Sequence, residues 1–131
     1  MTSYKYLVLV LLVGLIGGGW FGLARSNERV DSAYEGHVAA ARASAELGVT
    51  VDATAEYRAA LVIRPSYALA WELAEYLRVD GDPEDYRRTL AELVSTYPEE
   101  PDPYLALAEV KAREDEFPEA YATLVEALDA G

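Results

Sequence analysis

The sequence of 131 residues contains no cysteine and a single histidine. The lack of cysteine excludes a disulfide framework, a thiolate metal site and a cysteine nucleophile. Basic residues are also scarce, because 11 Lys and Arg stand against 23 Asp and Glu, which gives a formal net charge of −12. A protein that binds nucleic acid needs a basic face against the phosphates. The composition therefore argues against a nucleic-acid partner.

Charged and apolar residues are separated along the chain, whose length suits one domain of ordinary size. All acidic residues lie after residue 25, and Lys5 is the only basic residue before Arg25. Apolar residues make up 52% of the sequence, and the longest run of them is near the N-terminus. We therefore expect an anchor at residues 1–25, followed by an acidic domain.

An uncharged run extends from residue 6 to residue 24, between Lys5 and Arg25. At a rise of about 1.5 Å per residue, a helix of this length crosses the hydrocarbon core of a bilayer. The run predicts a single transmembrane helix with lipid around residues 6–24. The short N-terminal tail favours an extracytoplasmic position for the acidic domain, and a cytoplasmic position is the other orientation.

A cleaved signal peptide is a competing interpretation of the same segment. The small residues Gly22 and Ala24 resemble a cleavage site. The apolar run continues through the bulky Trp20 and Phe21 up to that site, which favours a retained anchor.

Three glycines, Gly14, Gly18 and Gly22, are spaced four residues apart within the apolar run. At this spacing they share one helix face, and small residues there let two membrane helices approach closely. We expect this face to pack against another helix. The alternative is that glycine is simply common in membrane helices.

The rest of the chain predicts an all-α fold. Alanine and leucine dominate, Gly and Pro separate segments of helical length, and no stretch alternates as a strand does. Ser66, Asp82 before Pro83, and Asp102 before Pro103 are expected to cap helix N-termini. The expected helices are at residues 31–47, 50–63, 67–80, 83–96, 102–115 and 118–129.

The acidic domain repeats itself with a period of about 34 residues. Ala74 aligns with Ala108, Leu90 aligns with Leu124, and Pro98 aligns with Pro65 in an earlier copy. The predicted domains are the anchor 1–25, a short helical linker 26–33 and a repeat domain 34–131. The repeat domain divides into units at 34–66, 67–100 and 101–131.

This pattern resembles the tetratricopeptide repeat (TPR) family, most specifically at residues 51–65. The first unit carries Ala41, Ala53, Tyr57, Ala60 and Pro65 at the characteristic positions. The second unit departs from the pattern, with Tyr86 and Leu93 where the family has alanine. A membrane anchor followed by such units is similar to bacterial cell-envelope proteins. The resemblance implies an α-solenoid of three helical hairpins after the transmembrane helix.

The resemblance also implies a concave groove that binds a peptide or a protein, lined by the first helix of each unit. Trp and Arg carry much of the energy in such interfaces. The alternative to a binding role is that Trp71 packs between units and that the arginines of the groove pair with glutamates on neighbouring helices. The chaperone-clamp subtype is not expected, since the only Asn in the chain is Asn27, outside the units. The predicted partner-binding residues are Arg42, Trp71, Glu75, Arg78, Glu109 and Arg113.

The last helix ends without the polar capping helix that usually closes such arrays. Its apolar residues Leu124, Val125 and Leu128 are therefore expected to be partly exposed. They are covered by a partner, by a second copy or by further chain.

No catalytic residues, cofactor or metal are predicted, because His37 stands alone and the acidic turns match no metal-binding loop. The predicted function is a non-catalytic, membrane-anchored TPR scaffold or adaptor. The alternative is an accessory structural subunit of a larger membrane complex, docked through its transmembrane helix. A third interpretation is a secreted binding module.

Overall fold

The computed structural model describes residues 26–130. The predicted membrane helix at residues 6–24, including Gly14, Gly18 and Gly22, lies outside the described residues. Among the helices that are described, none combines the length and the apolar character needed to cross a bilayer.

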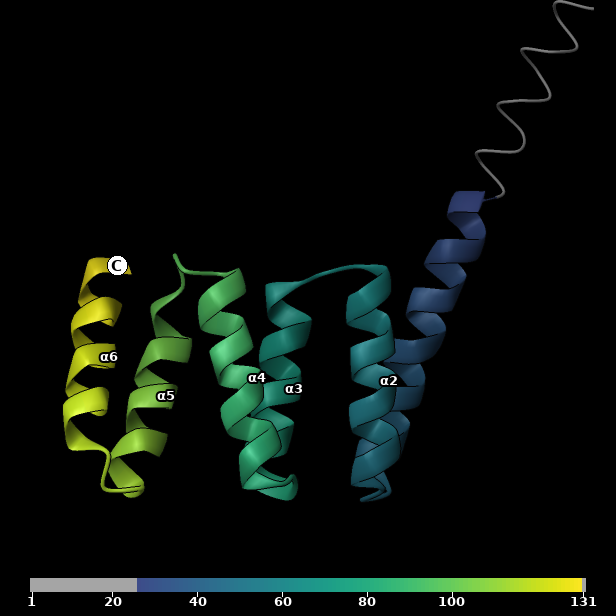
Figure 1. The fold of residues 1–131 in the computed structure, drawn as a ribbon. Helices are drawn as coiled ribbons and strands as arrows, with labels where there is room; N and C mark the ends of the chain where they lie inside the picture. The colour runs from purple at the N-terminus through teal and green to yellow at the C-terminus, as the bar shows by residue number, and fades with distance from the viewer. Residues whose placement is uncertain (1–25, 131) are drawn as a thin grey trace, which may run out of the picture.

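The described chain is entirely helical apart from its turns, which confirms the all-α class. Successive helices run up and down in a row, so that α6 forms one end (Figure 1). Contacts join α2 to α3, α3 to α4, α4 to α5 and α5 to α6. Residues 26–46 are helical and are followed by α2 (Thr50–Ile63), α3 (Tyr67–Asp80), α4 (Pro83–Thr96), α5 (Pro101–Arg113) and α6 (Phe117–Ala130).

Two of the three expected N-caps are confirmed. The Ser66 side chain accepts a hydrogen bond from the backbone N–H of Leu69 at 3.3 Å, and Asp82 accepts one from Glu84 at 3.0 Å. The prediction for Asp102 is wrong, because α5 already begins at Pro101. Proline in the first turn has its φ angle preset for a helix, so it starts α5 one residue earlier than expected.

Residues in the left-handed conformation end two of the helices. Gly48 has φ +71° and Asp115 has φ +61°. Glycine adopts this conformation freely, whereas Asp is among the few other residues that tolerate it. Because Asp115 turns the chain there, α5 ends at Arg113 and not at the predicted residue 115.

Small residues allow the helices to approach one another closely. Ala41, Ala74 and Ala108 occupy equivalent places in the three units, and all three are buried. Around these alanines, the hydrophobic core continues from one unit to the next. Leu69 and Leu73 of α3 pack with Val38, Ala41, Tyr57 and Ala60 in one cluster, and Ala74, Leu90, Leu93 and Leu107 form the other.

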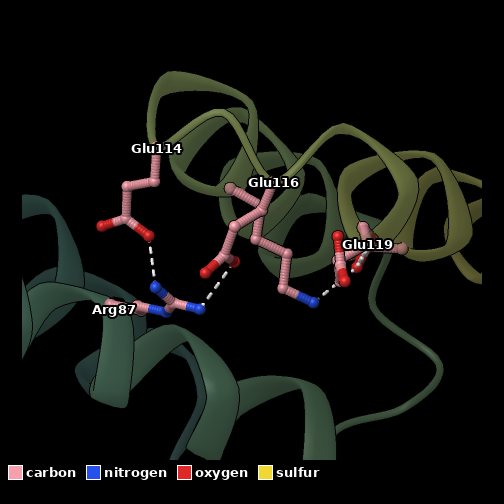
Figure 2. A network of polar contacts seen from close by, with 6 residues as sticks. Arg87, Glu114, Glu116 and Glu119 are labelled. Carbon is pink, nitrogen blue, oxygen red and sulfur yellow. Dashed lines mark hydrogen bonds and ion pairs between the residues drawn. The ribbon is translucent and has the colours of Figure 1, made fainter.

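An arginine on α4 holds the turn between α5 and α6 (Figure 2). The Arg87 guanidinium donates to Glu114 and, at 2.8 Å, to Glu116. Within the hairpin, Lys111 donates to the Thr123 hydroxyl at 2.9 Å, and that hydroxyl donates to the backbone carbonyl of Glu119 at 2.8 Å. These bonds fix α6 relative to the two helices before it.

Candidate functional site

A groove of about 360 Å³ lies between α3 and α5, with α4 behind it. Five of the six residues predicted to bind a partner line it: Trp71, Glu75, Arg78, Glu109 and Arg113. The helical repeat brings them together because one face of α3 and the equivalent face of α5 point into the same space. The other lining residues are Tyr86, Asp102, Leu105, Ala106 and Val110.

The charged side chains of the groove pair within their own helices. Arg78 donates to Glu75 at 2.9 Å and 3.2 Å, three residues along α3. Arg113 donates to Glu109, four residues along α5. The pairs therefore do not join neighbouring helices. All four side chains stay largely exposed, and exposed pairs contribute only about 0–1 kcal/mol. A ligand can replace either partner at little cost.

Trp71 both packs in the core and lines the groove. Its ring stacks on Tyr67, with centroids 6.3 Å apart and planes 19° apart. Tyr67 in turn meets Tyr97 of the α4–α5 connection edge to face, at 5.4 Å. This aromatic series holds the half-buried Trp71 ring in place, so a ligand meets a rigid apolar surface there. The two interpretations of Trp71 from the sequence are therefore compatible.

Tyr86 is a groove residue that was not predicted from the sequence. Its half-buried side chain comes from α4, and burial raises its pKa. Glu75 raises the pKa further, whereas Arg78 opposes the shift. A second hollow of about 250 Å³ shares Tyr86 and Arg78 with the first. The signal was present in the sequence, because Tyr86 stands where the resembled family has an alanine.

Arg42, the sixth predicted residue, is not among the residues that line this groove. It joins the first helix to α3 by donating to both carboxylate oxygens of Glu72, at 2.8 Å and 2.9 Å. Glu72 also accepts a hydrogen bond from the hydroxyl of Tyr57 at 2.8 Å. The bond from Arg42 lowers the pKa of Glu72. Burial, followed by the bond to Glu72, raises the pKa of Tyr57 to about 12.

The groove offers a peptide both apolar and polar contacts. Trp71 and Leu105 present carbon surface, and the two Arg–Glu pairs present hydrogen-bond donors and acceptors. His37 lies elsewhere, 2.5 Å from Glu56 of α2. Between residues 26 and 130, no three His, Asp or Glu side chains are grouped so as to hold a metal ion.

Comparison with known protein families finds none that matches the chain, and no curated protein sequence matches it either.

Proposed function

We propose that the protein is a membrane-anchored, TPR-like scaffold that binds a protein or peptide in the groove between α3 and α5. The observation that carries the proposal is the convergence of Trp71, Arg78 and Arg113 on one open groove. Tryptophan and arginine account for a large share of binding energy at protein interfaces. The membrane anchor at residues 6–24, the extracytoplasmic position of the repeats and the bacterial cell envelope as their location belong to the same proposal.

The groove is preorganised for such a partner. Stacking on Tyr67 holds Trp71 in place, and the helices on both sides share a buried core around Ala74 and Leu107. A preformed site loses little side-chain entropy on binding. An extended segment of a few residues fits the groove, with its main chain against the Arg–Glu pairs and one apolar side chain against Trp71.

Site-specific photocrosslinking in cells tests the proposal. A photoreactive amino acid replaces Leu105 in the groove, and a matched control replaces Val62, which is 84% exposed on α2. We expect a crosslinked partner from Leu105 alone. The crosslink disappears in Trp71→Ala or Arg78→Glu variants, because both remove contacts in the groove. Equal crosslinking from Val62, or an unchanged crosslink in both variants, contradicts the proposal.

The alternative function, an accessory structural subunit of a larger membrane complex, is favoured by large apolar side chains that stay uncovered on α6. In that case the predicted transmembrane helix makes the attachment, and the repeats cover a neighbouring subunit. Replacing Gly14 and Gly18 with leucine separates the two functions. Loss of the partner in this variant, together with retention in Trp71→Ala, supports the accessory subunit.

A further inference from the structure

Large apolar side chains stay partly or largely exposed along one face of α6. The face of α6 that is buried contains small residues, Ala120, Thr123 and Ala127. Soluble surfaces rarely expose a continuous row of large apolar residues unless it is an interaction site. We call this row the end stripe. It consists of Phe117, Tyr121, Leu124, Val125 and Leu128, which range from 41% to 81% exposed.

The spacing of the end stripe is that of a helix-packing surface. Phe117, Tyr121, Leu124 and Leu128 follow one another at intervals of four, three and four residues. This is the spacing of a coiled-coil seam, in which apolar residues face a second helix. The stripe is also held firmly, because Arg87 fixes the turn that leads into α6.

The preceding unit shows what covers the equivalent surface. Leu124 and Leu128 correspond in the repeat to Leu90 and Val94 of α4. Leu90 is completely buried, whereas Leu124 is 42% exposed. Leu90 and Val94 pack in a cluster with Leu107 of the next helix, α5. By this equivalence, the occupant of the end stripe is another helix.

The ion pairs between units all run in one direction among the described residues. In each, the earlier unit supplies an arginine and the later unit supplies an acid. The third unit has no arginine at the places equivalent to Arg42, Arg58 and Arg87. The residues there are Glu109, Val125 and Tyr121. Helix α6 contains no Lys or Arg at all, and Asp129 lies one turn after Val125 beside the stripe. The pairs between units are Arg42 with Glu72, Arg58 with Asp85, and Arg87 with Glu114 and Glu116.

The few basic residues of the third unit are already engaged. Lys111 donates to Thr123, and Arg113 pairs with Glu109. An acidic helix that packs on the end stripe, as α5 packs on α4, therefore finds no free cation there. A helix that carries Lys or Arg beside its apolar residues instead finds Asp129 at the edge of the stripe.

The same charges disfavour the other occupants. A second copy stacked end to end presents residues 26–46, where Glu28, Asp31, Glu35 and Glu46 outnumber the basic residues. Two copies joined through α6 bring no Lys or Arg of that helix to the Asp129 of either copy. An anionic lipid surface attracts helices with Lys and Arg on the polar face, and α6 has none.

We propose that the end stripe docks an amphipathic helix of another protein, whose apolar seam is flanked by Lys and Arg. This surface is separate from the groove between α3 and α5.

A selection experiment tests the proposal. A display library of amphipathic helices, about three heptads long, carries Leu and Ile at the seam and Lys, Glu or Gln at each flanking position. It is selected against the immobilised full-length chain in a mild nonionic detergent at low salt. We expect the recovered helices to be enriched in Lys at the flanks, and their binding to weaken as salt rises.

Variants show which surface the recovered helices use. Leu124→Ser and Leu128→Ser should each weaken binding about tenfold or more, because each removes an apolar side chain that the complex buries. The matched control, Val62→Ser, removes an equally exposed apolar residue on α2 and should leave binding unchanged. Since Leu128 is 81% exposed, its variant keeps the fold. Asp129→Lys should shift the preference at the adjacent flank from Lys to Glu.

The proposal is overturned if no helix is recovered, or if acidic and neutral flanks are recovered as often as basic ones. It is also overturned if binding is unaffected by Leu124→Ser and Leu128→Ser. Sedimentation analysis tests whether a second copy of the chain binds the end stripe. A dimer that dissociates in the Leu128→Ser variant shows that it does, and this result overturns the proposal as well. The groove variant Trp71→Ala leaves helix binding intact, so the result is independent of the proposed function.

Discussion

One substitution made at two equivalent places of the repeat measures how differently the units are covered. Leu90→Ala removes a side chain that is fully buried between α4 and α5. Deletions of this kind cost about 3 kcal/mol or more, since a cavity remains in addition to the lost transfer free energy. Leu124→Ala removes the equivalent side chain of α6, which is 42% exposed. No closed cavity forms there, and part of the carbon surface already contacts water, so we expect about 1 kcal/mol.

The assay is urea unfolding of the full-length protein, followed by far-ultraviolet circular dichroism. Leucine and alanine have similar helix propensities, so the difference of about 2 kcal/mol reports burial and not helix formation. Leu128→Ala, at a more exposed place in the same stripe, should change the free energy of unfolding by less than about 0.5 kcal/mol. Equal losses for Leu90→Ala and Leu124→Ala refute the reasoning, because the end stripe is then covered in the free protein.

Three further predictions concern substitutions at single positions. The folded state raises the pKa of Tyr57 from 10.0 to about 12. The protonated Tyr57 hydroxyl therefore contributes fully to the stability of the fold below pH about 10, and this contribution is lost as the pH rises toward about 12. Tyr57→Phe should reduce this loss in urea unfolding measured across the same pH range. Arg87→Ala should cost about 1 kcal/mol and speed hydrogen exchange in the α5–α6 turn, whereas Arg88→Ala, which removes a pair within α4, should change little. Gly48→Ala should cost about 1 kcal/mol because of its positive φ angle, whereas Gly36→Ala, inside a helix with open space around it, should stabilise by about 0.5–1 kcal/mol.

Each of these predictions has a clear contrary result. A pH slope that is identical in Tyr57→Phe assigns the alkaline loss to other groups. Equal exchange rates in the Arg87 and Arg88 variants remove the role of Arg87 at the turn. A stabilising Gly48→Ala contradicts the left-handed conformation at that residue.

Most of the helix boundaries were predictable because local chemistry determines them. Ser66 and the pair Asp82–Pro83 are strong N-terminal signals, and α2, α3 and α4 have the predicted bounds. For α5 the prediction missed both ends of the helix. Pro101 and Asp102 both favour a helix start, and the proline prevails. Asp115 ends α5 early by adopting a conformation that most residues avoid.

The groove was less predictable, because its content depends on which side chains reach across from other helices. The resemblance to the repeat family assigned Trp71 and Arg78 to one groove, and both line the groove between α3 and α5. It also placed Arg42 there, but a glutamate of the next unit binds its guanidinium. Tyr86 was overlooked because it belongs to the second helix of its unit. The pairing of Arg42 depends on a residue 30 positions away, which no local pattern specifies.

The direction of the ion pairs also restricts how such a chain can grow. A second copy of residues 67–100 could be inserted after residue 100. The Asp80 and Asp82 of the inserted copy would then take the places of Glu114 and Glu116, opposite Arg87 of the original copy. The middle unit carries both the arginine and the acids of this contact, so a duplicated copy keeps these ion pairs at each new boundary. A unit added after α6 finds no arginine to receive it. Duplication of the middle unit is thus compatible with the ion pairs between units, whereas α6 itself offers no Lys or Arg for such a pair.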